Sequence, residues 1–269
     1  MPNFMRPIHF SLLFTLTPLM FAMGGCSAKP ATNTTVTTLT NPDAIAYPSI
    51  DSGLSEQLYP NEKVIAEQIA DVIEKSIRKQ YAFGSARRDA HPKAHGCVRA
   101  EFQVLETLPK HLAKGLFIPG KKYQAWIRFS NGSPDATQAD IKKDARGMAI
   151  KVLAVSGAKR LEDEIATQDF IMINHPVFFV NDPNRYMSFM QDINSDRFFR
   201  KLHIPFALGS KGTRIALNLR TTIANPLQTR YWSMVPYQLG IGSDRQAVKY
   251  YVRSCSPVRD VLPSTPRQE

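Results

Sequence analysis

The stretch Tyr123–Ser130, YQAWIRFS, alternates apolar and polar side chains over its whole length. Side chains on a β-strand point alternately to opposite faces, so this pattern predicts a strand with one buried face. The apolar face holds Tyr123, Ala125, Ile127 and Phe129. The other face brings Arg128 and Ser130 together, with Trp126 two residues before Arg128. A cation and a hydroxyl on one strand face are either solvated side chains or part of a site.

The segments on either side of this strand show two periodicities. Alternation predicts further strands at VRAEFQV (98–104), RGMAIKVLAV (146–155), DFIMIN (169–174), TRIALNLRTT (213–222) and AVKYYVRSC (247–255). Helical spacing predicts a helix over 61–80, with Asn61 as its N-cap, and a helical segment over 184–202. Strands that follow one another locally, with helices set between them, predict an α+β domain with an antiparallel β core.

The N-terminus has the layout of an export signal. Arg6 is followed by an uncharged apolar run over 10–23, which is too short to span a bilayer comfortably. The ending MGGC resembles a bacterial lipobox, in which Cys26 would be lipidated; plain cleavage or a retained anchor helix are the alternatives. We therefore expect an exported protein, periplasmic or anchored to a membrane through a lipid.

Composition divides the chain further. Residues 1–25 are the predicted signal peptide, 26–53 form a Thr-, Pro- and Ser-rich flexible tether, 54–255 the folded domain and 256–269 an irregular tail. The net charge of +11 is dispersed in short basic runs, so we expect no nucleic-acid partner. Cys97 and Cys255 could pair in an oxidising compartment or remain separate thiols.

Two histidines, His91 and His95, stand four residues apart in the stretch RRDAHPKAHGCVRAEF (87–102). On one face of a helix they could bind a metal or lie exposed to solvent. Pro92 disfavours a helix there, and no third ligand follows in a recognisable pattern.

Four motifs in order, HPK (91–93), WIRFSNG (126–132), DARGMAIKV (144–152) and INHPVFFVNDP (173–183), resemble the haem catalase superfamily, and most closely its small bacterial catalase-related branch. The resemblance covers about 85–190 and extends weakly to about 255. It implies a catalase-like antiparallel β-barrel with surrounding helices, haem b as the cofactor, and decomposition of hydrogen peroxide or organic peroxides in oxidative-stress defence.

The resemblance also implies roles for individual residues. The distal catalytic set is His91, with Ser130 to orient its ring and Asn174 to donate to the peroxide. The cofactor-binding set is Arg88, Arg128 and Phe179, of which the arginines would pair with haem propionates. Phe102 stands one place later than in the family pattern, so His95 is the second choice for the distal histidine.

The family's tyrosinate ligand to the haem iron follows an arginine by four places. No arginine of this sequence has a tyrosine at that spacing; the nearest case is Arg245 with Tyr250. We therefore expect a barrel that is incomplete at the C-terminus and leave the axial ligand unassigned. A haem-dependent oxidoreductase of the catalase or peroxidase type is the leading expectation. A haem-deficient or non-catalytic lipoprotein remnant and a fatty-acid hydroperoxide isomerase are the alternatives.

Overall fold

The computed structural model describes residues 50–157, 159, 164–262 and 264–265. The predictions for residues 1–25, for Cys26 and for the tether as far as residue 49 lie outside these ranges. Within them, no helix is both long and apolar enough to cross a bilayer. The helices are α1 (Glu62–Gln80), α2 (Pro183–Ile193) and α3 (Phe198–Leu219), with short 3-10 turns at Ser52–Leu54, Pro226–Gln228 and Gly242–Asp244.

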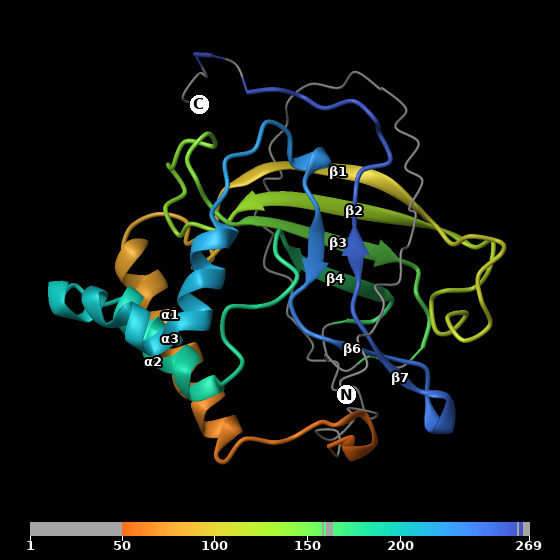
Figure 1. Cartoon of the computed structure of the whole chain (residues 1–269), viewed down its shortest axis with the longest axis horizontal. Coiled ribbons are helices and arrows are strands. Elements are labelled where there is room, and N and C mark those ends of the chain that lie inside the picture. The colour runs from red at the N-terminus through yellow and green to blue at the C-terminus, as the bar shows by residue number, and fades with distance from the viewer. Residues whose placement is uncertain (1–49, 158, 160–163, 263, 266–269) are drawn as a thin grey trace.

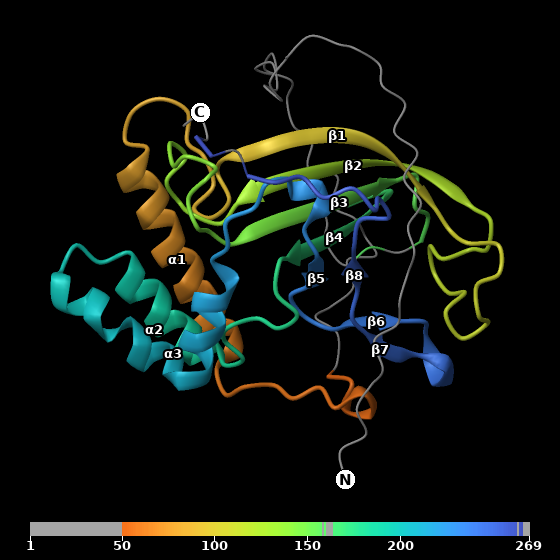
Figure 2. The ribbon, with the colours of Figure 1, turned by 45° about the horizontal axis from the view of Figure 1, so that its top comes forward.

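In the described part of the chain, eight strands form two antiparallel sheets (Figure 1). They are β1 (Ala94–Gln103), β2 (Lys122–Asn131), β3 (Arg146–Leu153), β4 (Thr167–Ile173), β5 (Tyr231–Ser233), β6 (Tyr237–Leu239), β7 (Gln246–Val248) and β8 (Tyr251–Val252). The larger sheet has the order β1-β2-β3-β4-β5-β8, and β6 pairs with β7. The large sheet is curled into a half-barrel (Figure 2). The predicted α+β class, with an antiparallel barrel-type sheet and surrounding helices, is confirmed.

The core lies inside the curl of the large sheet. Across three strands the register aligns Ile127 with Ile150 and Ile150 with Phe170, so one apolar face is continuous. Phe102 stacks on Phe170 with ring centroids 5.9 Å apart, and Phe117 packs against both rings. The four residues that alternation assigned to the buried face of β2 are at most 5% exposed. The opposite, outer face of the sheet carries Arg128 and Ser130.

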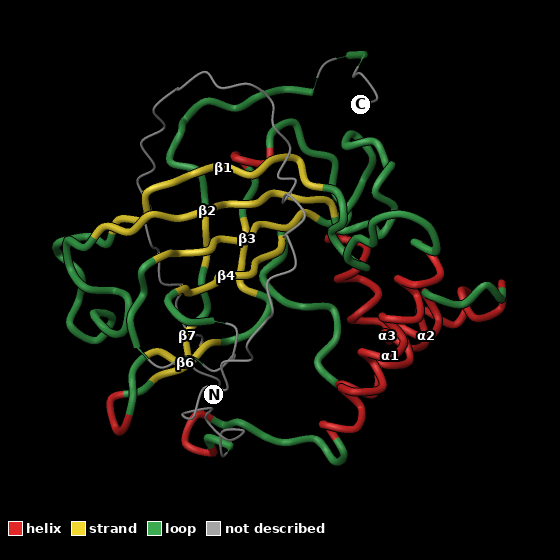
Figure 3. The backbone as a smooth tube through the Cα atoms, turned by 180° about the vertical axis from the view of Figure 1, so that it is seen from behind, coloured by secondary structure: helices red, strands yellow, loops and turns green. Residues whose placement is uncertain are grey.

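The three helices gather at one end of the sheet, away from β6 and β7 (Figure 3). The predicted helix over 61–80 is confirmed as α1, but Asn61 caps it only by position. Its backbone is left-handed (φ 59°) and its side chain makes no cap hydrogen bond. The Glu62 carboxylate instead accepts a hydrogen bond from the Tyr59 backbone N–H at 3.0 Å. That bond closes the turn before the helix.

A buried carboxylate connects α2 to α3. Asp192, which is fully buried, bonds to His203 Nδ1 at 2.7 Å and to Arg200 Nη1 at 3.1 Å. A charge removed from water is tolerated only where hydrogen bonds and opposite charges replace the lost hydration. Arg200 and His203 of α3 therefore fix how the helices pack.

Three of the sequence predictions need correction. The segment 184–202 is two helices, because α2 ends at Ile193 and α3 begins at Phe198. The strand predicted at 213–222 is wrong, since α3 is helical to Leu219. Its alternation is local, whereas Arg, Ala and Leu are strong helix formers. The strand predicted at 247–255 is interrupted, with β7 ending at Val248 and β8 starting at Tyr251.

Candidate functional site

The outer face of β2 carries a histidine–serine pair. His91 lies in the loop before β1, and its Nδ1 is 2.9 Å from Ser130 Oγ. Ser130 is only 3% exposed, so its hydroxyl is shielded from competing water. This hydrogen bond fixes the imidazole ring and leaves Nε2 as the ring nitrogen that can act on a ligand.

Two neighbours hold His91 in place. Gly147 of β3 lies under the ring, where a Cβ would sit 2.7 Å from both His91 Cε1 and Nδ1. Only glycine therefore allows the ring to lie this close to the strand. Arg128 Nη2 donates to the His91 carbonyl oxygen at 2.6 Å. That bond supports a left-handed backbone at His91 (φ 58°), which is uncommon for a residue with a side chain.

The surroundings of His91 favour the neutral imidazole. Burial is the largest cause that lowers its pKa below the ordinary 6.5, and the charges of Arg128 and Arg88 lower it further. Asp144 acts in the opposite direction but does not reverse the shift. At neutral pH the ring is therefore an unprotonated base, the state that proton abstraction requires.

His95 lies on the opposite face of the sheet from His91. Its Nε2 is 2.6 Å from Asn131 Oδ1, and its Nδ1 is 3.4 Å from Asp140 Oδ2. Ser130 and Asn131 are successive residues of one strand, so the histidines that bond to them are separated by the sheet. The i, i+4 spacing is therefore not a metal pair, and the described part of the chain holds no group of three or more metal-ligating side chains.

A buried arginine organises the network around His95. Arg146 is 1% exposed and donates to Asn131 Oδ1, to the Asp140 carbonyl at 3.0 Å and to the Lys142 carbonyl at 2.7 Å. It also reaches the Thr221 carbonyl at 3.1 Å, which ties the end of α3 to the site. These contacts assign a structural role to His95 and Arg146.

Asn174 is fully engaged by the backbone and by Thr221. Its Oδ1 accepts from the Arg146 backbone N–H at 2.8 Å. Its Nδ2 donates to the Leu219 carbonyl at 2.9 Å and to Thr221 Oγ1 at 3.1 Å. An amide nitrogen has two hydrogens, so neither is left over for a ligand in this arrangement. The predicted donation from Asn174 to a peroxide stays a prediction, and it requires one of these bonds to open.

Comparisons with known proteins find catalases. The Catalase family model matches residues 75–198, the part of the chain that carries the histidine–serine pair and all four motifs. This segment, a little under half of the chain, is similar to the catalase superfamily.

Individual catalases match over similar segments. The catalase of Latilactobacillus sakei is 30% identical over 110 residues, which is 40% of this chain and 21% of that catalase. The catalase of Methanosarcina barkeri is 31% identical over 104 residues, 38% of this chain and 19% of that catalase. The chain therefore spans about a fifth of the length of these relatives.

Solved catalase structures also align. Catalase A from Saccharomyces cerevisiae aligns with a TM-score of 0.41 and 21% identity, over 61% of this chain and 34% of that one. A fungal catalase aligns with a TM-score of 0.45 and 18% identity, over 87% of this chain and 46% of that one.

The outer face fits one side of the haem that the catalase superfamily implies. The register places Ala149 between Arg128 and Ile171, and Gly147 next to Ser130. The small residues Gly147 and Ala149 on the middle strand leave a flat surface, which we call the floor. Arg128 lies at one edge of the floor, and Ile171, which is 42% exposed, lies at the other. A planar macrocycle with anionic propionates suits a flat floor with a guanidinium at its edge.

The other predicted cofactor residues lie around the His91 loop. Arg88 is exposed in the loop before His91, close enough for its charge to lower the pKa of that histidine. The ring centroid of Phe179 is 4.4 Å from that of its neighbour Phe178 and 5.1 Å from that of Phe189 in α2. Burial raises the pKa of Tyr186 in this aromatic cluster, and the charge of Asp89 raises it further. The cluster therefore lies next to the loop that carries Arg88 and His91.

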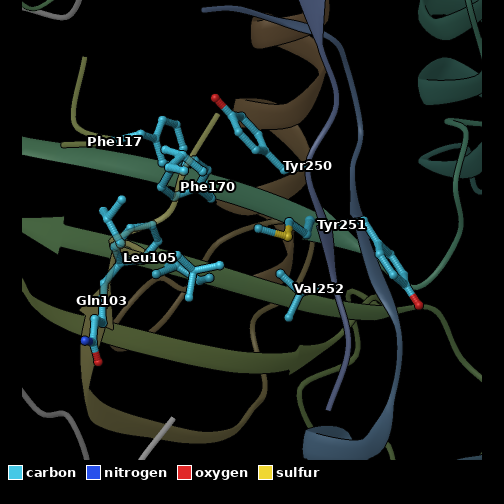
Figure 4. A pocket seen from close by; sticks show the side chains of 12 residues that line it. Gln103, Leu105, Phe117, Phe170, Tyr250, Tyr251 and Val252 are labelled. Atoms are coloured by element: carbon cyan, nitrogen blue, oxygen red, sulfur yellow. The ribbon is translucent and has the colours of Figure 1, made fainter. Parts of the chain in front are cut away.

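Tyr250, the nearest sequence candidate for a catalase axial ligand, lies inside the curl of the sheet. Its ring centroid is 4.8 Å from that of Phe170, and both line the cavity in Figure 4. Burial raises its pKa to about 12, so it is a neutral phenol rather than a tyrosinate. The cavity holds about 40 Å³, room for water but not for a cofactor. It belongs to the core, on the face of the sheet opposite His91.

Sequence reasoning missed Gly147 and Arg146 as part of the site. A glycine within an alternating strand often marks a close approach, so the RG pair at 146–147 carried a usable signal. Nothing in the alternation reveals which side chain approaches. Cys97 is half-buried and Cys255 is exposed.

Proposed function

We propose that this protein is a haem-dependent oxidoreductase of the catalase type that decomposes hydrogen peroxide or organic peroxides in defence against oxidative stress. The observation that carries the proposal is the His91–Ser130 pair on the outer face, a buried imidazole with a lowered pKa and a fixed ring. The similarity of residues 75–198 to the catalase superfamily supports the same reaction class.

His91 is the proton carrier in this proposal. We infer that its Nδ1–H donates to Ser130 Oγ, the tautomer in which Nε2 carries the free lone pair. Nε2 takes a proton from one peroxide oxygen and returns it to the other, so that this oxygen leaves as water. Ser130 keeps the correct tautomer throughout. Haem b, when bound, supplies the redox-active iron for O–O cleavage.

Two arginines would hold the cofactor. Arg128 lies at the edge of the flat floor, and Arg88 lies in the loop beside it. Each guanidinium can donate two parallel hydrogen bonds to a propionate. Both cations also keep His91 unprotonated. Phe179 contributes packing from the aromatic cluster at the helical end. The axial ligand of the iron is not assigned.

Asn174 favours a second candidate function, a haem-binding protein without efficient turnover. Both hydrogens of its amide are used by Leu219 and Thr221. In that state the peroxide would lack one of the donors that the family resemblance implies. The variant Thr221→Val removes the hydroxyl that accepts from the Asn174 amide, and it separates the two candidates. If turnover rises in this variant, the engagement of the Asn174 amide limits the reaction.

The decisive experiment is haem reconstitution followed by peroxide turnover. The full chain, supplied with haem, should give a Soret band and release oxygen from hydrogen peroxide. His91→Ala should abolish oxygen release while the Soret band remains, whereas His111→Ala, which removes an exposed imidazole, should change neither. A missing Soret band contradicts haem binding. Loss of turnover in His95→Ala but not in His91→Ala contradicts the assignment of the distal histidine.

Export and lipid attachment at Cys26 remain part of the proposal. The apolar run over 10–23 and the MGGC ending support them. Metabolic labelling with a radioactive fatty acid should mark the parent chain and not Cys26→Ser. A parent chain without label contradicts the lipid anchor.

A further inference from the structure

The first half of α3, residues 198–208, exposes apolar side chains to solvent on one side. On its inner side Ala207 and Leu208 are buried. Its outer side carries Phe198, Phe199, Leu202 and Phe206, which are 68%, 82%, 54% and 78% exposed. Single exposed apolar residues are common, but three phenylalanines and a leucine within nine residues are a patch that calls for a partner.

These four residues form one continuous stripe. At about 100° per residue they fall within an arc of about 100° around the helix axis. Lys201 follows the arc on one side and His203 on the other, so basic side chains border the apolar stripe. Gly209 then interrupts the helix with φ 68° and ψ 173°. The segment 198–208 is therefore a short helix of its own, at the outer side of the helical end in Figures 1 and 2.

A basic hollow adjoins the start of this helix. It has a volume of about 410 Å³ and lies between α1 and the α2–α3 connection. Its cations are Lys75, Lys79, Arg197 and Arg200. Lys79 pairs with Asp196 and Arg200 with Asp192. Lys75 and Arg197 form no salt bridge with a described carboxylate, so the hollow keeps positive charge for an anionic ligand.

We propose that this surface docks the protein onto an anionic phospholipid bilayer. We name it the α3 surface and define it as the apolar stripe together with the four cations of the hollow. The phenylalanines would enter the boundary between head groups and acyl chains, while the hollow would accept lipid phosphates. Apolar side chains bordered by Lys and Arg are the features of helices that lie in a membrane interface. A neutral apolar partner would not need the positive charge that Lys75 and Arg197 leave in the hollow.

The docking differs from both the peroxide chemistry and the predicted lipid at Cys26. The stripe lies on α3, whereas His91 and Ser130 belong to the loop before β1 and to β2. Binding through the α3 surface would fix the orientation of the domain on the membrane, which a lipid at the end of the predicted tether cannot do.

Depth-dependent fluorescence quenching in the full chain tests the proposal locally. Phe206→Trp introduces a reporter in the stripe, and Ile241→Trp a matched reporter at an exposed site (84%) on the β6–β7 connection. The parent chain gives the background from Trp126 and Trp232. Phosphatidylglycerol vesicles with brominated acyl chains should quench the reporter at 206 and not the one at 241. Phosphatidylcholine vesicles should quench it less.

Vesicle co-sedimentation provides the second measurement. Phe199→Ser with Phe206→Ser should weaken binding to phosphatidylglycerol vesicles by about tenfold or more, while Ile241→Ser should leave it unchanged. Arg197→Glu should weaken it, and added salt should do the same. The N-terminal segment is common to all variants, so it cannot produce these differences.

Equal quenching at 206 and 241 overturns the proposal. A second set of results also overturns it: the parent chain self-associates in ultracentrifugation, the double serine variant is monomeric, and no quenching occurs at 206. The stripe then binds a second copy of the chain. Far-UV circular dichroism of each variant verifies that the fold is retained.

Discussion

Gly147→Ala tests the site through one added carbon atom. The new Cβ would lie 2.7 Å from His91 Cε1 and Nδ1 and 2.8 Å from Ser130 Oγ. An ordinary contact begins near 3.4 Å, so the ring must move by about 0.7 Å. A shift of that size away from the strand lengthens the 2.9 Å bond to Ser130 to about 3.6 Å, which is no longer a hydrogen bond.

The energetic cost follows from three contributions. The lost hydrogen bond costs about 1 kcal/mol, and overpacking of the tight contact adds about 1–3 kcal/mol. Alanine also restricts the unfolded chain more than glycine does, which stabilises the folded state by about 0.4–1 kcal/mol. We expect the free energy of unfolding to fall by about 1–3.5 kcal/mol. Oxygen release by the haem-loaded protein should fall about 100-fold, because a misplacement near 1 Å costs about that factor.

Gly96→Ala is the matched control. Gly96 lies on the neighbouring strand β1, also has no positive φ, and an added Cβ would meet nothing within 4 Å. Urea denaturation followed by circular dichroism measures stability, and an oxygen electrode measures turnover. If Gly147→Ala matches the parent chain in both measurements, His91 does not pack on Gly147 and the reasoning fails.

Further predictions concern the helices and pH. Asp192→Asn should lower the free energy of unfolding by about 1.5–3 kcal/mol in chemical denaturation, because a fully buried carboxylate loses its charged bonds. Asp196→Asn, at an exposed ion pair, should cost less than about 1 kcal/mol, and equal costs would contradict this account. The lowered pKa of His91 means that the unfolded chain binds its proton more readily. This residue's contribution to stability is therefore complete above pH 6.5 and is lost as pH falls toward its folded pKa. Peroxide turnover should stay constant as the pH is lowered to 6.5 and should fall only below it. Arg88→Ala should move that decline to higher pH, because the charge of Arg88 lowers the pKa of His91. An unchanged pH profile would show that this charge does not act on His91. Gly209→Ala should destabilise the fold by about 1 kcal/mol or more in thermal unfolding, since φ is 68° there, and no change would mean that the break in α3 imposes no strain.

The sequence by itself determined four strands of the half-barrel, β1 to β4. Alternation over Tyr123–Ser130 reports burial on one face directly, because the side-chain period of a strand is two. The same reasoning put Arg128 and Ser130 together on the other face, and the structure keeps them there. Alternation failed at 213–222, where apolar residues at every second position occur within a helix. A short pattern of that kind cannot by itself separate two conformations, so contacts elsewhere in the chain decide.

Only the tertiary structure decided which histidine belongs to the site. The sequence ranked His91 first and left His95 as the second choice; in the structure one bonds to Ser130 and the other to Asn131, on opposite faces of β2. The choice depends on pairings between loop and strand that are 36 to 39 residues apart in the chain. Gly147 under the imidazole and the two acceptors that engage Asn174 are equally long-range contacts. Local periodicity assigns a face to each residue, but packing between distant segments determines which groups on that face meet.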